Sequence, residues 1–452
     1  MSVRAQSRTN IFYKQMISVQ DALQKIVNST QNFGIEEIPL MQSVGSILKE
    51  NIFADRDFPP FNRVAMDGIA IDFQQFQNGQ RAFKIEGIQA AGSEQITLQN
   101  PENCIEVMTG AVLPKKATAV IRYEDVQIKD DVATIQINAI NDGQNIHEQG
   151  KDKQQGALLI SRNTKISAAE IGVLATVGKS TVKVARQPTV MIISTGDELV
   201  NVAQKPLAHQ IRKSNVYTLV SLLERLHINS ETAHIVDDKS ILKEKINRYL
   251  QEYDVLLFSG AVSKGKYDFL PEVLEELGVE KLFHTVAQRP GKPFWFGVTD
   301  TFGMSEQDVY QDEESNKSLS DIEMKDNVSQ VVNKRSENKS QKNTIVFAFP
   351  GNPISTYVNC LAYFYPWYHK SVGLKLEQET AILGEDISFK PKMTYFLQVK
   401  LNYKFGQFLA FPMRGNGSGD LASLVQTDGF MQLPSDQTEF KKGEVFPVIR
   451  YR

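Results

Sequence analysis

Cysteine and histidine are scarce, and neither occurs in a metal-binding pattern. The 452-residue chain holds two cysteines, Cys104 and Cys360, and six histidines. The cysteines lie far apart and the histidines show neither HxH nor HExxH spacing, so neither a zinc site nor a catalytic triad is supported. We expect both cysteines to be reduced structural thiols, as is usual in a cytoplasmic protein.

Long apolar runs and an excess of charge are also missing. No apolar stretch approaches the roughly 18 residues that a membrane helix needs, and residues 1–18 lack the apolar core of a signal peptide. The formal net charge of −3 gives no overall attraction to nucleic acid or to an anionic membrane. We therefore expect no nucleic-acid partner and no membrane attachment. Any anion site must be a local group of lysine and arginine.

The chain changes character several times, which predicts a multidomain protein. An amphipathic helix with a serine cap is expected at 18–30, short β-like runs dominate 80–140, and a second helical piece follows at 167–178. The predicted domains are a discontinuous N-terminal domain (14–54 with 144–184), an inserted β-rich domain (55–143), an α/β domain (185–373) and a C-terminal β domain (374–452).

From residue 188 onward, strands alternate with helices. Strands are expected at 188–196, 231–238 and 254–260, and helices at 213–226, 239–253 and 267–277. This alternation predicts a mostly parallel sheet with helices on both faces. In such sheets ligands bind beyond the carboxyl ends of the strands, where the segments STGDE and SGAVSKGKYD lie.

One segment of the α/β region does not fit this alternation. Residues 303–343 are polar, dense in charge and almost without aromatic residues. Such a composition cannot bury enough apolar surface to offset its ordering entropy, so it predicts a disordered insertion between two strands.

The segment GAVSKGKY at 260–267 resembles a phosphate-binding P-loop but ends in tyrosine instead of serine or threonine. A strand, a glycine-containing turn and a helix would still place backbone N–H groups at a helix N-terminus, where anions bind. Asp268 is expected just inside that helix, as a cap or a cation ligand. The expected ligand-binding residues of the loop are Gly260, Ser263, Lys264, Gly265 and Lys266.

Two further turns carry features of an anion site. RPGKP at 289–293 sets Arg289 and Lys292 around a rigid turn, which offers a bidentate guanidinium fork and a point charge. FPGNPIS at 349–355 places Pro353 at the expected first position of a helix.

Several carboxylates occur in turns, where each alone is more often a cap than a catalyst. Next to a phosphate site they would repel the ligand unless a divalent cation lay between them, and Mg²⁺ typically uses one or two carboxylates. Convergence of several would indicate Mg²⁺-assisted chemistry on a phosphorylated substrate. The candidates are Asp67, Asp152, Asp197, Glu198, Asp237, Asp238 and Asp268.

Taken together, eight segments resemble the molybdopterin molybdenumtransferases of the MoeA family, and the E domain of gephyrin is similar. They occur in the family's order and cover nearly the whole chain except 303–343. They are FNRVAMDGIAI, VMTGAVLP, GQNIHEQGKD, ISTGDELV, SGAVSKGKYDF, VAQRPGKPFWFG, FPGNPIS and MRGNGSGDLASLVQTDGFMQLP.

The resemblance implies a fold and an activity. The fold would combine a central MogA-like α/β domain, related to the pathway's adenylyltransferase, with an inserted β module, a discontinuous linker domain and a C-terminal β module. The activity would be Mg²⁺-assisted insertion of molybdate into adenylylated molybdopterin, with release of AMP. The resemblance also implies an elongated cytoplasmic homodimer whose active site uses both subunits, with transient contacts to the adenylyltransferase and to apo-molybdoenzymes.

The resemblance also implies roles for individual residues. The catalytic set would be Asp67, Thr109, Asp152, Glu198 and Asp268. With Asp237 from the turn carboxylates, Glu198 and Asp268 form the expected metal set. The substrate-binding set would add Arg289, Lys292, Pro350, Gly351, Asn352, Arg414 and Ser418 to the loop residues of 260–266. Three positions depart from the family pattern: Ala261 replaces a glycine, His147 an arginine and Tyr123 a small apolar residue.

Two other classes stay open on sequence grounds. A non-catalytic scaffold or molybdopterin-binding paralogue would tolerate loss of the carboxylates, and a P-loop NTPase would hydrolyse ATP without any pterin. The tyrosine at 267 disfavours the NTPase, because it cannot replace the Mg²⁺-binding hydroxyl.

Overall fold

The computed structural model describes residues 16–262, 268–299, 343–413, 415, 417 and 419–452. It contains two compact units: residues 35–185 form one, and the described residues up to Gly34 and from Arg186 onward form the other. The predicted division into four domains stays a prediction. Among the described residues, no helix combines the length and apolar character needed to cross a bilayer.

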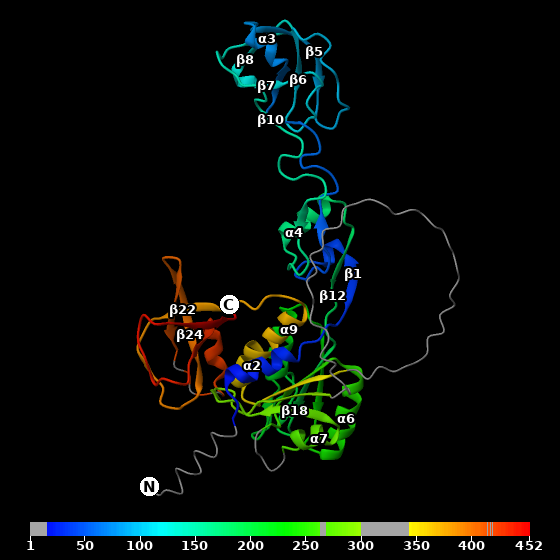
Figure 1. The fold of residues 1–452 in the computed structure, drawn as a ribbon. Helices are drawn as coiled ribbons and strands as arrows, with labels where there is room; N and C mark the ends of the chain where they lie inside the picture. Colours follow the sequence, from blue (N-terminus) through cyan, green and yellow to red (C-terminus); the bar gives the residue numbers. More distant parts are fainter. Residues whose placement is uncertain (1–15, 263–267, 300–342, 414, 416, 418) are drawn as a thin grey trace, which may run out of the picture. The chain divides into compact units, whose positions relative to one another are not determined.

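The larger unit is built on a six-stranded α/β sheet (Figure 1). The strand order is β16-β13-β17-β21-β20-β18, with the first four parallel and the last two antiparallel to their neighbours. The mostly parallel sheet is therefore confirmed, and an antiparallel edge is added to it. The strands are β13 (Val190–Thr195), β16 (Ser230–Ile235), β17 (Val255–Ser259), β18 (Val279–His284), β20 (Trp295–Thr299) and β21 (Ile345–Phe349).

Helices cover both faces of this sheet, as the alternating pattern predicts. One face packs α6 (Lys239–Glu252) and α7 (Leu270–Glu276) into a core with Ile193, Phe258 and Ala348. The opposite face packs Phe347 against Phe364 and Trp367. The helical segments around that face are α5 (Asn215–Glu224), α8 (Pro353–Asn359), the π-helix η3 (Cys360–Phe364) and α9 (Tyr365–Ser371). Two short strands, β14 (Leu199–Val200) and β15 (Ile211–Arg212), pair outside the main sheet.

The N-terminal helix α2 (Val19–Asn28) belongs to this unit. Ser18 caps it, its hydroxyl accepting a hydrogen bond from the Asp21 N–H at 3.0 Å, as the serine predicts. Trp367 Nε1 donates to the Ser29 carbonyl at 3.1 Å and stacks edge-on against Phe33. The chain then leaves the unit at Gly34 and returns at Arg186, whose N–H donates to the Gly34 carbonyl at 3.1 Å.

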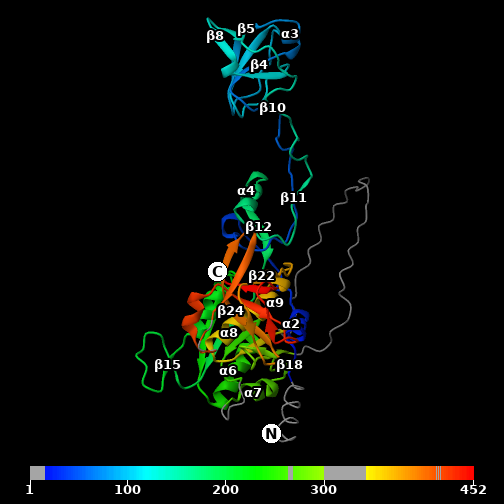
Figure 2. The ribbon, with the colours of Figure 1, turned by 90° about the vertical axis from the view of Figure 1, so that its left-hand side faces the viewer.

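A closed β-barrel completes the larger unit (Figure 2). β24 pairs with both β25 and β26, and β26 pairs with β28, so the sheet β19-β24-β25-β22-β28-β26 closes on itself around an apolar core. Its elements are β19 (Gln288–Arg289), β22 (Glu379–Leu383), β24 (Thr394–Lys404), β25 (Gln407–Pro412), η4 (Leu421–Gln426), β26 (Gly429–Leu433) and β28 (Val445–Arg450), with β23 (Ile387–Ser388) pairing with β27 (Glu439–Phe440).

The smaller unit contains a six-stranded half-barrel in the order β7-β4-β6-β5-β9-β8. Alternate residues of β4 face two cores: Ile69 and Ile71 enter one, and Ala70 enters the other. The elements of this module are β3 (Arg63–Val64), β4 (Gly68–Ile71), α3 (Phe73–Gln77), β5 (Ala82–Gln89), β6 (Asn103–Val107), β7 (Ala119–Arg122), η2 (Tyr123–Asp125), β8 (Val126–Lys129), β9 (Val132–Ile135) and β10 (Ile146–His147).

The rest of the smaller unit has its own small core. Helix α4 begins with a reciprocal capping box between Ser167 and Glu170. The elements are β1 (Ile35–Pro39), η1 (Leu40–Gln42), β2 (Ile52–Phe53), β11 (Leu158–Ile160), α4 (Ala168–Thr176) and β12 (Thr181–Ala185), with β1 paired to β12 and β2 to β11.

The structure differs from one expectation, the position of Asp268, and describes almost nothing of the segment 303–343. Helix α7 begins at Leu270 with Phe269 as its cap residue, so Asp268 lies before the helix and not inside it. That prediction was wrong, because residues 268 and 269 continue the loop before the first helical residue. The insertion expected at 303–343 lies outside the described residues except for Asn343.

A partly buried carboxylate of the barrel, Asp428, predicts how the stability of the protein to unfolding depends on pH. Burial pushes the pKa of Asp428 upward, but hydrogen bonds from Lys400 Nζ (2.8 Å) and Leu401 N (2.9 Å) outweigh it and hold the pKa below its usual range. This stabilisation is present above the unfolded pKa of about 3.9 and is lost as pH falls through the folded value. Asp428→Asn should therefore lower stability by about 1–2 kcal/mol at neutral pH.

The measurement is thermal unfolding followed by circular dichroism from pH 7 down to about pH 3. The difference between Asp428→Asn and the unchanged protein should shrink as the pH falls. The control is Asp386→Asn, whose Lys441 pair is solvent-exposed and should contribute less. An equal, pH-independent loss in both variants would contradict the prediction.

Candidate functional site

The register of the parallel strands brings four loops to one edge of the α/β sheet. Ser194 of β13 pairs with His234 of β16 and with Ser259 of β17, which in turn pairs with Phe349 of β21. The segments that follow these residues therefore leave the sheet side by side. They contain the carboxylates of 197–198 and 237, the loop from Gly260, and the Pro350–Pro353 turn.

A cavity of about 450 Å³ opens at this edge. It is lined by six of the residues predicted from sequence: Glu198, Asp237, Gly260, Asp268, Gly351 and Asn352. We call it the acidic cavity. The structure thus brings the whole predicted metal set to one place, with glycine backbone from two loops beside it.

The loop after β13 is shaped by Gly196. Its φ of +121° favours glycine, and a Cβ there would lie 2.4 Å from Glu198 Oε2. The neighbouring Asp197 accepts a hydrogen bond through Oδ1 from the Asp237 N–H at 3.2 Å. Carboxylates from two loops are therefore held close together by backbone geometry.

The carboxylates of the acidic cavity repel one another. Partial removal from water raises the pKa of Asp237, and the charges of Asp197, Glu198 and Asp268 raise it further. A divalent cation would relieve this repulsion, so the donor set suits Mg²⁺. Among the described residues, however, no three His, Cys, Asp or Glu side chains lie close enough to hold a metal by themselves. The residues thus fit a cation that also takes oxygens from a ligand or water.

The polar residues of the acidic cavity that sequence reasoning missed include Asn215 and Lys213. Asn215 donates from Nδ2 to the Gly351 carbonyl (2.7 Å) and to Ser259 Oγ (2.9 Å), which ties the helix α5 to two of the edge loops. Lys213 lines the same cavity, and burial lowers the pKa of its ammonium group. The signal was the polar segment IRKSN at 211–215, which spans the start of the helix predicted at 213–226.

The loop that resembles a P-loop has its backbone in left-handed conformations. Gly260 has φ +113° and Ala261 has φ +56°. The sequence raised the question whether Ala261 needs a positive φ, and in this structure it has one. Ser263, Lys264, Gly265 and Lys266 lie outside the described residues, so their predicted roles stay predictions. Helix α7 starts only at Leu270, whereas a P-loop leads directly into its helix.

A second cavity, of about 420 Å³, lies beside the RPGKP turn. We call it the cationic cavity, because Arg289 and Lys292 line it. Gly351 and Asn352 line both cavities, so the Pro350–Pro353 turn is a shared wall. Ser355, which is 2% exposed, also lines the cationic cavity and was not singled out from the sequence.

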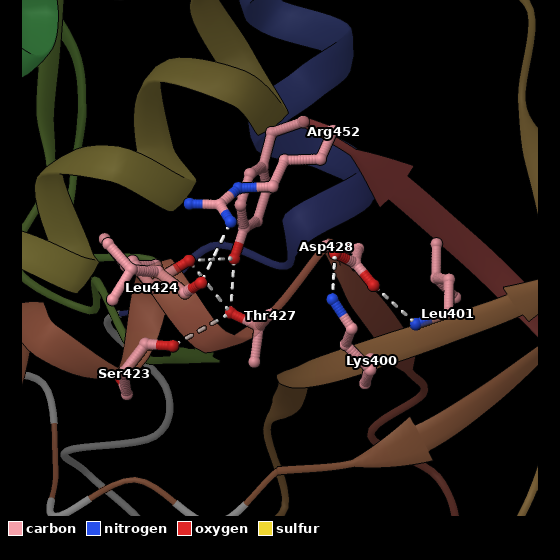
Figure 3. Close-up of polar contacts among 9 residues, drawn as sticks. Lys400, Leu401, Ser423, Leu424, Thr427, Asp428 and Arg452 are labelled. Carbon is pink, nitrogen blue, oxygen red and sulfur yellow. Dashed lines mark hydrogen bonds and ion pairs between the residues drawn. The ribbon is translucent and has the colours of Figure 1, made fainter.

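The barrel contributes one residue to the acidic cavity. Gly419 lines it, two residues before the first residue of the 3-10 helix η4. The carboxyl end of the chain holds η4: Arg452 Nη1 donates to the Val425 carbonyl at 2.9 Å, and the Tyr451 hydroxyl lies against Thr427 and Leu424 (Figure 3). Arg414 and Ser418 lie outside the described residues.

The smaller unit joins two predicted catalytic residues. The Thr109 N–H donates to Asp67 Oδ1 at 2.6 Å, and this bond, together with one from the threonine side chain, lowers the pKa of Asp67. Asp67 and Thr109 are both exposed. The departure Tyr123 lies next to them: its N–H donates to the Asp67 carbonyl, and its hydroxyl donates to Glu106 at 2.5 Å. Asp67 is thus held ionised at an exposed position of this unit.

The other predicted residue of this unit, Asp152, forms part of a chain of three side chains. Asp152 Oδ1 lies 3.0 Å from His147 Nε2, and Arg63 Nη2 lies 3.1 Å from His147 Nδ1. Because a guanidinium can only donate, Nδ1 accepts and Nε2 carries the proton toward Asp152. His147, which replaces an arginine of the family pattern, therefore links Asp152 to the guanidinium of Arg63 instead of supplying a positive charge itself.

These features define a class of protein: a multidomain α/β protein with cavities at the carboxyl ends of its parallel strands that are lined by carboxylates and cations. The family models agree. Residues 17–178 match the MoeA N-terminal region (domain I and II), 191–369 a probable molybdopterin binding domain, and 380–451 the MoeA C-terminal region (domain IV).

Curated relatives and solved structures extend the match over the chain. A molybdopterin molybdenumtransferase of Synechocystis sp. is 37% identical over 439 residues, 96% of this chain and 100% of that protein. One from Staphylococcus epidermidis is 28% identical over 443 residues, 96% and 95% of the two chains. The MoeA protein of Pyrococcus horikoshii has a TM-score of 0.74 at 27% identity and covers 97% of this chain and 100% of that chain. The chain belongs to the MoeA family.

One substitution in the acidic cavity is expected to raise the stability of the cation-free protein and to weaken its response to Mg²⁺. The folded pKa of Asp237 lies above the unfolded value of about 3.9, so its charge destabilises the protein at neutral pH, and this effect disappears as pH falls below that value. Asp237→Asn should raise the unfolding temperature without divalent cations and reduce the stabilisation that added Mg²⁺ provides.

The measurement is thermal unfolding at pH 7.5 across a Mg²⁺ titration. The control is Asp238→Asn: Asp238 caps α6 through a 2.9 Å bond from the Ile241 N–H, and asparagine caps equally well. The expectation fails if Asp237→Asn lowers stability without Mg²⁺ or leaves the Mg²⁺ response unchanged.

The left-handed backbone at Ala261 generates a further prediction. A non-glycine residue in this region costs about 1 kcal/mol, and a β-branched one costs more. Ala261→Gly should thus leave the unfolding temperature equal or higher, whereas Ala261→Val should lower it. Thermal unfolding of both variants checks this order. The control, Ala287→Gly, replaces an alanine without positive φ and should be destabilising; a loss in Ala261→Gly as large as in Ala287→Gly would contradict the prediction.

Proposed function

We propose that the protein is a molybdopterin molybdenumtransferase, which inserts molybdate into adenylylated molybdopterin and releases AMP. The observation that carries the proposal is the pair of cavities that share the Pro350–Pro353 turn, within a chain that matches curated molybdenumtransferases along nearly its whole length. The reaction brings together two anions, molybdate and a pyrophosphate-linked nucleotide, and the two cavities offer different chemistry for them.

The cationic cavity is the proposed oxyanion site. Arg289 offers a bidentate fork for two oxygens and Lys292 a point charge. The hydroxyl of Ser355 adds a neutral donor from the same wall. Such fixed donors stabilise an anion without reorganising during the reaction.

The acidic cavity is the proposed site for the phosphates together with Mg²⁺. Glu198, Asp237 and Asp268 would hold the cation, and Mg²⁺, when bound, would neutralise charge on the pyrophosphate. The described backbone at Gly260 and Gly351 allows close approach of the ligand. Ser263, Lys264, Gly265 and Lys266 are proposed to bind the same phosphates. The shared wall would set the distance between pyrophosphate and oxyanion, so that both reactants are held in one geometry.

The remaining residues are assigned by the same proposal. Asp67, Thr109 and Asp152 would act on the substrate from the smaller unit of a second copy in a homodimer, and Arg414 and Ser418 would close the site from the barrel side. The protein would work in the cytoplasm and meet the adenylyltransferase and apo-molybdoenzymes transiently. The four domains expected from sequence are part of this proposal.

The test is a defined reaction of purified protein with Mg²⁺, molybdate and adenylylated molybdopterin. We expect AMP release coupled to activation of an apo-molybdoenzyme. Asp268→Ala and Asp67→Ala should each reduce both readouts by about 100-fold or more, the size expected when a preorganised electrostatic contact is lost. The controls Asp436→Ala and Asp142→Ala remove exposed carboxylates from the same units and should be active.

The same experiment separates the alternatives. The substitutions at Ala261 and His147 favour a scaffold or a molybdopterin-binding paralogue as the second candidate, because either could mark a lost activity. That candidate predicts no AMP release, and molybdopterin binding that survives Asp268→Ala. Release of phosphate from ATP without pterin would instead indicate an NTPase.

A further inference from the structure

Beneath the cationic cavity lies a buried chain of amide and hydroxyl groups that the proposed reaction does not use directly. Gln288, Asn359 and Tyr363 are each 0% exposed. The Tyr363 hydroxyl donates to Gln288 Oε1, and Gln288 Nε2 donates to Asn359 Oδ1 at 2.7 Å. We call this chain the Tyr363–Gln288–Asn359 relay. It joins residues more than 70 positions apart in the sequence.

The relay ends on the backbone of the RPGKP turn. Gln288 Nε2 also donates to the Pro290 carbonyl at 2.9 Å, and Asn359 Nδ2 donates to the Gly291 carbonyl at 3.3 Å. The next carbonyl, that of Lys292, accepts from the Val286 N–H at 3.0 Å. Three successive carbonyls of the turn are therefore held by donors from the protein.

Holding the carbonyls also fixes the direction of the N–H groups. In a trans peptide the N–H points opposite to the C=O, and neither the Pro290–Gly291 nor the Gly291–Lys292 peptide is cis. The Gly291 N–H therefore points away from the relay, and Gly291 lines the cationic cavity. Within the described part of the chain, this N–H donates no hydrogen bond to protein.

Two independent features indicate that the relay is fitted to the RPGKP turn. Gly291 has φ +88°, and a Cβ on it would lie 2.5 Å from Asn359 Oδ1 and 2.7 Å from Gln288 Nε2, so the relay packs directly on the glycine. The π-helix η3 begins immediately after Asn359 and contains Tyr363. Single π-helical turns inside α-helices occur frequently at functional sites.

The direction of the relay is determined by its first member. Burial raises the pKa of Tyr363, which keeps the phenol protonated and able to donate. With Gln288 Oε1 occupied by that hydroxyl, Gln288 Nε2 faces Asn359 Oδ1 and the Pro290 carbonyl. Asn359 Nδ2 is then left for Gly291. A reversed amide would set an oxygen against each of those two acceptors, which is unfavourable in a buried site.

We propose that the relay is a positioning device, which turns the Gly291 N–H into the cationic cavity as a backbone donor for a tetrahedral oxyanion beside Arg289 and Lys292. Tyr363, Gln288 and Asn359 are positioning residues: Gln288 lies in the wall of the cavity, but all three are 0% exposed and act through the turn. The inference rests on the proposed function, in which this cavity holds molybdate. It adds a neutral, fixed donor to two flexible charged ones.

The sequence allows a direct observation of this N–H. Pro-Gly occurs twice in the chain, at 290–291 and at 350–351. Labelling with ¹³C-carbonyl proline and ¹⁵N-glycine therefore yields two correlated amide signals in an HNCO spectrum, both from the walls of the cationic cavity. Comparison with Gly351→Ala assigns them. We expect molybdate to move the Gly291 proton signal downfield, as hydrogen bonding to an anion does.

Tyr363→Phe tests the relay, because it removes one hydroxyl and leaves the ring in place. Its matched control is Tyr365→Phe, which removes a hydroxyl that donates to the Leu222 carbonyl at 2.7 Å on the same helical segment. By calorimetry, molybdate affinity should fall about tenfold or more in Tyr363→Phe, the size of one hydrogen bond to a charged group, and stay within twofold in Tyr365→Phe. Tyr363→Phe should also shift the ligand-free Gly291 signal.

The outcomes separate the two proposals. If the unchanged protein binds molybdate but the Gly291 signal stays in place, or if both tyrosine variants bind equally, the relay has only a structural role and this inference is overturned. If the unchanged protein binds no molybdate, the proposed oxyanion site fails and the inference fails with it. Asn359→Leu interrupts the relay at a second point and should reproduce the loss seen in Tyr363→Phe.

Discussion

The functional part of this molecule depends on one constraint, the in-register pairing of four parallel strands. His234, Ser194, Ser259 and Phe349 lie on one line across the sheet. A shift of one residue in any pair would displace the loop that follows, and it would turn the buried side chains of the strand to the other face. Both faces are packed with apolar side chains, so the core that stabilises the sheet also determines where the loops emerge.

The second organising feature is the separation of charge by the Pro350–Pro353 turn. Carboxylates line the cavity on one side and Arg289 and Lys292 line the cavity on the other. This separation is partial, because the cations Arg212 and Lys213 also line the acidic cavity. The turn, which contains two prolines and a glycine, is a shared wall that keeps Arg289 and Lys292 on the other side from the carboxylates.

Much of this arrangement was predictable from sequence, because it rests on local patterns. Alternating strands and helices predicted the sheet, and turn residues at strand ends singled out Glu198, Asp237, Gly260 and Gly351 as candidates, which the structure brings to one cavity. The antiparallel edge was missed, since a short apolar run does not reveal the direction of its neighbours. Asp268 was placed inside a helix that begins two residues later.

What the sequence could not predict depends on contacts between distant segments. Lys213 lies just before α5 and Asn215 is its first residue, and both look like ordinary surface residues until α5 packs beside the edge loops. Nothing in the sequence distinguishes Gln288, Asn359 and Tyr363 from other polar residues and tyrosines of the chain. Their roles emerge only when β19 and the helix α8 are brought together.

The way in which the chain enters and leaves the smaller unit has a consequence for how such a protein can be assembled. The exit at Gly34 and the return at Arg186 are joined by a backbone hydrogen bond, and the Arg186 guanidinium also donates to the Phe33 carbonyl at 2.5 Å. The two ends of the 151-residue smaller unit, 35–185, therefore meet at a single point of the larger one. Topologically, the smaller unit is a domain insertion into a continuous host, and Gly34 could be joined to Arg186 without stretching the chain. A gene that lost or exchanged the segment between them would still encode a host with its sheet, barrel and both cavities connected.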